Sequence, residues 1–224
     1  MKLVFFGDSL TWGGYGGSYF NELKPLLPDH ELINAGEGGN TVINLLRRLE
    51  DDVLSHEPNG VFVMVGGNDA ISYSQPKTRQ YYEQVQQIPG GVVTPDQFSQ
   101  AYRDLLTRLH LAHTLVWIGL PPIEANPTVV ETTKQYNDLA SESARALNIS
   151  LLDLMTEFTP ANLPERAPID MSLILTIGAR LKDGWNEFAK AQAEGGFTFT
   201  FDGLHFMPES AKRVAQRIAP FITT

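Results

Sequence analysis

The sequence contains no cysteine among its 224 residues. Disulfide bonds, zinc–thiolate sites and cysteine nucleophiles are therefore excluded, and the composition fits a reducing compartment. No apolar run approaches the roughly 18 residues of a membrane-spanning helix. The opening residues, MKLVFFGDSL, hold too short an apolar stretch for a secretion signal and no small-residue cleavage site. We therefore expect a cytoplasmic protein without a membrane span.

Basic residues are also scarce: 17 Lys and Arg stand against 26 Asp and Glu, which gives a net charge of −9. No basic block occurs, and contacts to phosphate groups need clustered positive charge, so nucleic acid is not an expected partner. The chain lacks an HExxH pattern and any cluster of histidines, and the glycine-rich stretch GGYGGSY fits neither nucleotide-binding spacing. We therefore expect no metal and no other cofactor.

Short apolar runs alternate with longer amphipathic stretches along the chain. The near-continuous apolar runs indicate strands that helices cover on both faces. The predicted strands are 2–6, 31–34, 61–65, 114–118 and 149–152. The predicted helices lie at about 18–26, 41–54, 95–111, 129–146 and 208–219. This alternation predicts an α/β fold with a doubly wound parallel sheet.

The length suits one domain, 1–224, but two segments do not fit the simple alternation. Residues 70–94 form a long connection rich in Tyr and Gln, and 155–201 is far longer than an ordinary loop. Within the second segment, 169–190 has helical spacing with Gly178 and Gly184 as breaks, and FTFTF at 197–201 suggests a short strand or an extended edge. Two interpretations of 169–190 stay open: ordinary packing, or a cap that restricts the site to short acyl chains.

Polar, glycine-rich segments directly follow the first three predicted strands. They are Gly7-Asp8-Ser9, NAGEGGNT at 34–41 and GGND at 66–69. The carboxyl ends of parallel strands meet at one edge of the sheet, where such folds bind ligands. The sequence therefore predicts a catalytic site at this edge.

Ser9 is the candidate nucleophile of this site, because a turn at the end of a strand does not itself need a serine. A serine nucleophile needs a base, and the base needs an orienting acceptor. Asp202 and His205, in the sequence FDGLHF, can supply both. We expect Asp8 to tie neighbouring loops together rather than to act as an acid.

Acyl transfer develops an oxyanion, and three groups could donate hydrogen bonds to it. They are the backbone N–H of Ser9, the backbone N–H of Gly39 and the side-chain amide of Asn68. Two alternatives stay open: a neighbouring glycine could replace Gly39, and Asn68 could merely stabilise a turn. Trp12 and Tyr15 follow the nucleophile and are candidates for lining the acyl pocket.

These segments together resemble the SGNH family, also called the GDSL esterases and lipases. The resemblance is carried by GDSL at 7–10, Gly39, Asn68, and Asp202 with His205 in DGLH. It implies a three-layer α/β/α sandwich around a mainly parallel, five-stranded sheet of the flavodoxin-like type. It further implies a serine hydrolase with Ser9 as nucleophile, His205 as base and Asp202 as its partner.

By the same resemblance, Ser9, Gly39 and Asn68 form the oxyanion hole. The segments 70–94 and 155–201 depart from the family and leave the substrate open. The leading hypothesis is an esterase that hydrolyses small acyl esters through an acyl-enzyme. The alternatives are a carbohydrate acetylesterase, an acyltransferase, or a binding protein that has lost catalysis. The sequence leaves the oligomeric state open.

Overall fold

Five parallel strands form the centre of the molecule, in the order β2-β1-β3-β4-β5. The computed structural model describes residues 1–223. The strands are β1 (Lys2–Gly7), β2 (Glu31–Gly36), β3 (Gly60–Met64), β4 (Leu115–Leu120) and β5 (Ser150–Asp153). The chain passes from β1 to the edge strand β2 and then crosses to β3 on the other side of β1. This strand order confirms the predicted five-stranded flavodoxin-like sheet.

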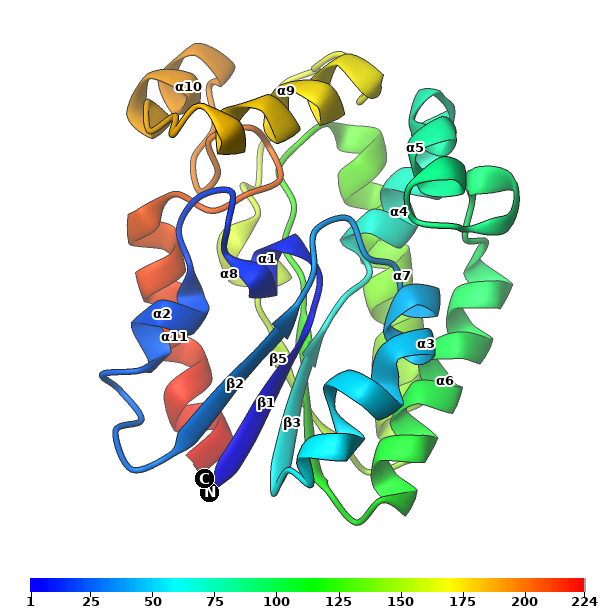
Figure 1. The fold of residues 1–224 in the computed structure, drawn as a ribbon. Helices are drawn as coiled ribbons and strands as arrows, with labels where there is room; N and C mark the ends of the chain where they lie inside the picture. Colours follow the sequence, from blue (N-terminus) through cyan, green and yellow to red (C-terminus); the bar gives the residue numbers. More distant parts are fainter. Residues whose placement is uncertain (224) are drawn as a thin grey trace.

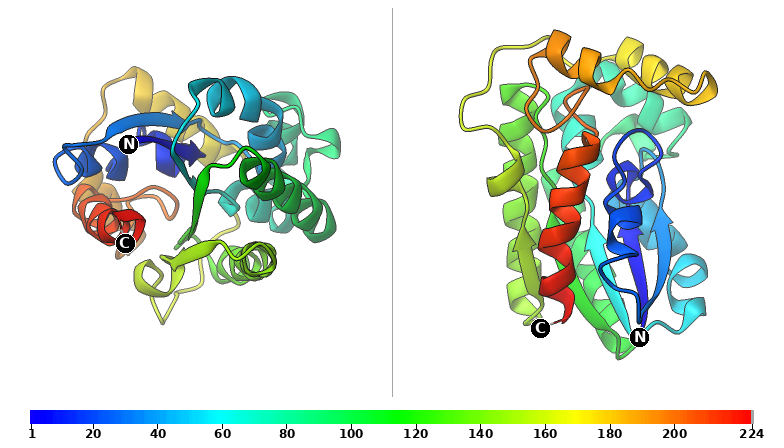
Figure 2. Two further views of the ribbon diagram at one scale, coloured as in Figure 1. Left: turned by 90° about the horizontal axis from the view of Figure 1, so that it is seen from below. Right: turned by 90° about the vertical axis from the view of Figure 1, so that its left-hand side faces the viewer.

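Helices lie on both faces of the sheet (Figures 1 and 2). The α-helices are α1 (Ser9–Trp12), α2 (Tyr19–Leu23), α3 (Val42–Asp52), α4 (Gly67–Ser74), α5 (Arg79–Gln84), α6 (Pro95–Leu111), α7 (Pro127–Ala146), α8 (Met155–Phe158), α9 (Met171–Lys182), α10 (Phe188–Gly195) and α11 (Pro208–Thr223). Short 3-10 turns occur at Leu54–His56, Pro76–Thr78 and Pro89–Gly91.

The alternation of side chains along β1 creates two hydrophobic cores. Val4 and Phe6 point to the core shared with α3, α6 and α7. Leu3 and Phe5 point to the opposite core, shared with α2 and α11. This packing places α11 against the sheet beside β1, so the loop that precedes α11 reaches the end of the first strand.

The segment 169–190 contains α9 and the first turn of α10, and these two helices lie across the carboxyl ends of the strands at the top of Figure 1. Of the two predicted breaks, only the one at Gly184 is correct. Gly184 has a φ of +62° and lies between the helices, whereas Gly178 continues α9 without interruption. Asp170 caps α9 by accepting hydrogen bonds from the N–H groups of Ser172 and Leu173.

Of the two alternatives for 197–201, the short strand is wrong. This stretch makes one isolated bridge, between Thr200 and Phe206, and belongs to no sheet. Its backbone N–H groups at Thr198, Phe199 and Thr200 instead donate to the carboxylate of Glu124. In a sheet, the carbonyl groups of a neighbouring strand would accept hydrogen bonds from these N–H groups. Here the side chain of Glu124, distant in the sequence, accepts them instead.

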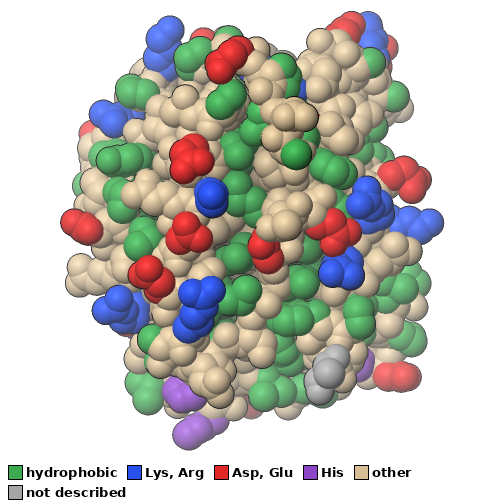
Figure 3. Space-filling model, turned by 180° about the vertical axis from the view of Figure 1, so that it is seen from behind, with side chains coloured by type: hydrophobic (Ala, Val, Ile, Leu, Met, Phe, Trp, Pro, Cys, Tyr) green, Lys and Arg blue, Asp and Glu red, His purple; other side chains and the backbone are tan. Residues whose placement is uncertain are grey.

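The surface carries charges of both signs. On the face seen in Figure 3, Lys and Arg side chains are interspersed with Asp and Glu and do not gather into a basic block. Within residues 1–223, no helix has the length and apolar character needed to cross a bilayer.

Candidate active site

The loop after β1 presents Ser9 as the first residue of the short helix α1. Asp8 caps this helix: its carboxyl group accepts a hydrogen bond of 3.0 Å from the N–H of Leu10 and one of 3.3 Å from Nδ2 of Asn68. Burial raises the pKa of Asp8 to about 6. Asp8 therefore ties the β1 loop to the α4 loop. The N–H of Ser9 lies in the first turn of α1 and has no acceptor within the helix.

The turn before α11 brings a histidine and a carboxylate to Ser9. Nδ1 of His205 lies 2.8 Å from Oδ2 of Asp202, and Nε2 of His205 lies 3.0 Å from Oγ of Ser9. Oδ1 of Asp202 accepts hydrogen bonds from the N–H groups of Leu204 and His205, at 3.0 and 2.8 Å. With Nδ1 protonated, the other ring nitrogen is free to accept the proton of Ser9. The aspartate thus orients the ring.

All three side chains are almost fully buried: Ser9 is 9%, Asp202 8% and His205 6% exposed. Burial alone would raise the pKa of Asp202, but the charge of His205 and the hydrogen bonds to the carboxylate outweigh it. The pKa of Asp202 consequently lies below its ordinary value, and the group stays a carboxylate at neutral pH.

Asn68 and Gly39 reach the same place from two other loops. Asn68, in the first turn of α4, donates from Nδ2 to Asp8 and accepts at Oδ1 from the hydroxyl of Tyr82 at 2.9 Å. An amide NH₂ has two hydrogens, so one remains for a ligand. Gly39 has a φ of +78°, and a Cβ there would overlap the hydroxyl of Tyr81. Only glycine fits this position.

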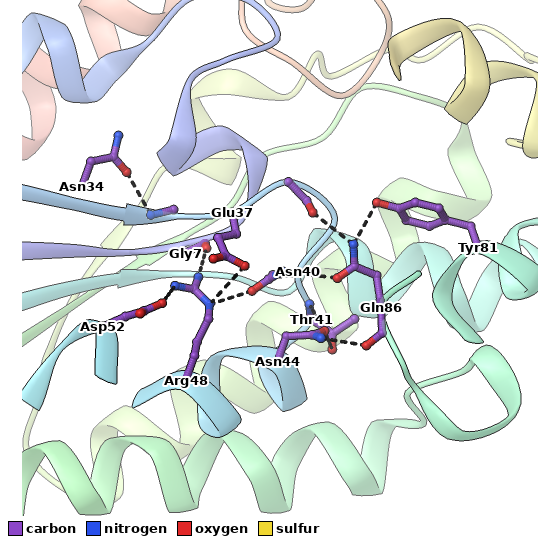
Figure 4. A network of polar contacts seen from close by, with 12 residues as sticks. Gly7, Asn34, Glu37, Asn40, Thr41, Asn44, Arg48, Asp52, Tyr81 and Gln86 are labelled. Atoms are coloured by element: carbon purple, nitrogen blue, oxygen red, sulfur yellow. Dashed lines mark hydrogen bonds and ion pairs between the residues drawn. The ribbon is translucent and has the colours of Figure 1, made fainter. Parts of the chain in front are cut away.

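A polar network holds the Gly39 loop in place (Figure 4). Arg48 on α3 donates to the carbonyl of Gly7 and to Oδ1 of Asn40, each at 2.8 Å. Gln86 donates to the carbonyl of Gly38 at 3.1 Å and accepts from Nδ2 of Asn40 at 3.2 Å. The segment 70–94 therefore supports the loop that carries Gly39 and does not merely connect two helices.

Glu124 anchors the segment that leads into the Asp202–His205 turn. It is 1% exposed, and its carboxylate accepts from the N–H groups of Thr198, Phe199 and Thr200 and from the hydroxyl of Thr200. The N–H of Glu124 in turn donates to the carbonyl of Gly203 at 3.0 Å. These bonds join the loop after β4 to the loop that carries the histidine.

Glu124→Gln is expected to destabilise the fold by about 2 kcal/mol, because an amide nitrogen then faces backbone donors that a carboxylate accepted from. The melting temperature should fall by about 4–8 °C, measured by thermal unfolding monitored by circular dichroism. The matched control is Glu157→Gln, since this half-buried partner of Arg213 and Arg217 forms ion pairs with two exposed arginines and binds no backbone N–H group that the structure shows. Equal melting temperatures for the two variants would contradict the anchoring role.

A cavity of about 160 Å³ opens beside Ser9. It is smaller than the roughly 300–1,000 Å³ of pockets for drug-sized ligands, so it suits a small part of a substrate. Ser9, His205, Gly39 and Asn68 are among the residues that line it. The rest of the wall is aliphatic and aromatic, with Asp8 as its one carboxyl group; it is contributed by Asp8, Leu10, Tyr15, Gly67, Ile71, Tyr81, Tyr82, Pro122, Ile123, Ile169, Ile174, Ile177, Gly178 and Leu204.

The two aromatic candidates differ in position. Tyr15 lines the cavity, and its ring lies 4.7 Å from that of His205. Trp12 is 38% exposed and packs against Tyr15 at 5.0 Å between ring centroids. Trp12 is not among the residues that line the cavity, so of the two candidates only Tyr15 lies in its wall.

The structure thus brings together Ser9, Asp202, His205, Gly39 and Asn68, as the sequence motifs led us to expect. Sequence reasoning missed Arg48, Gln86 and Glu124. The signal for Glu124 was an acid within the otherwise apolar PPIEA stretch after β4. Arg48 and Gln86 carried no signal, because helices and loops commonly expose such residues.

Comparisons with known proteins agree with this fold. An acetylxylan esterase of Geobacillus stearothermophilus is 35% identical over 179 residues, which cover 70% of this chain and 77% of that protein. The crystal structure of the acetyl xylan esterase AlAXEase superposes with a TM-score of 0.68 at 22% identity, covering 99% of this chain and 100% of the other. The lipase/acylhydrolase of Enterococcus faecalis gives a TM-score of 0.64 at 20% identity, covering 99% of this chain and 94% of the other.

The model of the GDSL-like lipase/acylhydrolase family matches residues 5–173. The matched stretch contains Ser9, Gly39 and Asn68 and ends in the first turn of α9. It covers well over half of the chain. The chain therefore belongs to the GDSL-like lipase/acylhydrolase family, and it is a carboxylic ester hydrolase.

Proposed function

We propose that this protein hydrolyses small acyl esters through a triad of Ser9, His205 and Asp202. The observation that carries the proposal is the position of His205, which lies within hydrogen-bond distance of both Ser9 Oγ and the carboxylate of Asp202. A serine, a base and an orienting acid in this arrangement are what nucleophilic acyl transfer requires.

In the first half of the reaction, Ser9 Oγ attacks the ester carbonyl carbon while its proton passes to Nε2 of His205. The negative charge that develops on the carbonyl oxygen is held by the N–H groups of Ser9 and Gly39 and by Nδ2 of Asn68. When the tetrahedral intermediate collapses, His205 gives its proton to the departing alkoxide. An alcohol leaves, and the acyl group remains on Ser9.

In the second half, His205 removes a proton from water, and the resulting oxygen nucleophile attacks the acyl-enzyme. Collapse of this intermediate returns the proton from His205 to Ser9 and releases the acid. Asp202 stays ionised throughout and stabilises the imidazolium that forms twice per turnover. The small, largely aliphatic cavity beside Ser9 receives the acyl group.

The proposal is tested by assaying the purified protein against p-nitrophenyl esters of graded acyl length. We expect saturable hydrolysis of the short esters and stoichiometric inactivation by a fluorophosphonate. Absence of both hydrolysis and inactivation would overturn it.

Carbohydrate acetyl ester hydrolysis is a second candidate, favoured by the 35% identity to an acetylxylan esterase. An acetylated xylo-oligosaccharide should then release acetate with a higher kcat/KM than p-nitrophenyl acetate, because contacts to the sugar add binding energy. Acetate release can be followed by a coupled enzymatic assay. No acetate above the uncatalysed rate would rule this candidate out.

Asn68→Ala is expected to lower kcat by about 10²–10³-fold with little change in KM, because the amide acts mainly on the transition state. Steady-state kinetics on a short ester provide the measurement. Tyr82→Phe is the matched variant: it keeps the amide and removes only the hydroxyl that holds Oδ1 of Asn68. We expect a smaller loss there. A change in KM alone would make Asn68 a residue for substrate binding instead.

A further inference from the structure

Gly178 occupies a position in α9 where the backbone does not need a glycine. Its φ is negative and it lies inside the helix, four residues before Lys182 at the end. A Cβ at this position would meet no atom within 4 Å, in contrast to Gly39, where a Cβ would overlap Tyr81. Neither conformation nor crowding therefore explains the glycine. In a helix interior it lowers stability relative to alanine.

Gly178 faces the cavity beside Ser9. Ile174, Ile177 and Gly178 all line this cavity, and their spacing of three and four residues places them on one side of the helix. Because Gly178 has no side chain, this part of the cavity wall is formed by backbone alone. Any side chain there would project into the space beside the nucleophile.

Apart from Tyr15, Tyr81, Tyr82 and Asp8, most of the remaining wall is aliphatic, and it extends over more surface than an acetyl group can cover. Besides α9, it includes Ile71 of α4, Ile123 after β4, and Leu204 beside His205. The single methyl of an acetyl group cannot contact side chains from all of these elements at once. Each additional methylene buried against such a wall increases binding about fourfold.

We propose that Gly178 determines acyl specificity: because it has no side chain, this position of α9 leaves open a pocket for acyl chains longer than acetyl, such as butyryl and hexanoyl. The inference rests on the proposed esterase function. It names one position within 169–190 that sets how long an acyl chain the pocket accepts. Glycine at this position thus lowers the stability of α9 and enlarges the pocket.

The experiment compares kcat/KM for p-nitrophenyl acetate, butyrate and hexanoate in the unmodified protein and in Gly178→Leu. We expect the unmodified protein to prefer butyrate over acetate by about tenfold, from two added methylenes. Gly178→Leu should lose about tenfold or more on butyrate and hexanoate and change less than about threefold on acetate. Ala179→Leu is the matched control, because Ala179 is the exposed neighbour on the same helix. It should keep the original profile.

Two further variants keep the result readable if leucine disturbs the helix. Gly178→Met supplies an unbranched chain that favours helix formation, and it should shorten the acyl preference in the same way. Gly178→Ala should raise the melting temperature by about 2–4 °C. It should lower kcat/KM for hexanoate more than kcat/KM for butyrate or acetate.

Three results would overturn the assignment. An unchanged chain-length profile in Gly178→Leu and Gly178→Met would mean that the position does not border the acyl pocket. Equal losses on all three esters would indicate general damage to the site. The third result would come from acetate esters of different alcohols. If Gly178→Leu changed kcat/KM only within that series and not with acyl length, the pocket would hold the alcohol and not the acyl chain. Failure of the triad itself is recognised separately, because Ser9→Ala would then retain activity.

Discussion

Ser9→Ala is expected to lower kcat for a short p-nitrophenyl ester by about 10⁴–10⁶-fold. The substitution removes the atom that lies 3.0 Å from Nε2 of His205, so the base has no nucleophile to activate. The donors that stabilise the oxyanion remain, and they leave a residual rate above that in water. Because alanine fills less space than serine at a buried position, substrate binding should be retained and KM should change little.

The measurement combines steady-state kinetics with mass spectrometry of a fluorophosphonate adduct. In the unmodified protein the adduct should map to Ser9, and Ser9→Ala should not be labelled. Ser99→Ala on α6 is the control, since α6 contributes no residue to the cavity wall. Labelling at another serine, or full activity of Ser9→Ala, would remove Ser9 from the mechanism.

The strands and the main site residues could be predicted because their signals are local. A short, near-continuous apolar run such as VFVMV at 61–65 is typical of a strand that helices cover on both faces. Ser9 and the Asp202–His205 pair belong to short turns whose geometry depends on adjacent residues. The shared edge of a parallel sheet then brings these turns together.

The remaining features depend on contacts between residues far apart in the sequence. The alternation in FTFTF is the same for an edge strand and for a loop held by a buried carboxylate, and the deciding partner, Glu124, lies more than 70 residues away. The low helix propensity of glycine predicts a break at Gly178. Whether a helix continues through a glycine depends on how its neighbouring turns are packed, and the sequence does not show that packing. Ile177 is buried beneath that turn and the helix continues through it.

The support of the Gly39 loop by Arg48 and Gln86 was equally hidden. Each bond in that network joins elements that only the folded sheet brings together. A long connecting segment that supports another loop resembles, in its sequence, one that only bridges two helices. The function of 70–94 therefore became visible only with the fold.

Asp202→Asn is expected to lower kcat by about 10⁴-fold while leaving the fold intact. The reason lies in the hydrogen bonds to the other carboxylate oxygen. Oδ1 of Asp202 accepts from two backbone N–H groups, those of Leu204 and His205. In the asparagine variant the amide oxygen must keep this position, because the amide nitrogen is a donor and cannot accept from them.

The amide NH₂ of the variant then faces Nδ1 of His205 and donates to it. That ring nitrogen must become the acceptor, so the proton moves to Nε2 and points at Ser9 Oγ. In this tautomer His205 cannot take the proton of Ser9, and the loss therefore falls on kcat and not on KM. Steady-state kinetics and a circular dichroism spectrum provide the measurement, with Asp183→Asn, an exposed carboxylate beside α9, as the matched control. Near-normal activity of Asp202→Asn would mean that the backbone, and not this carboxylate, orients the ring.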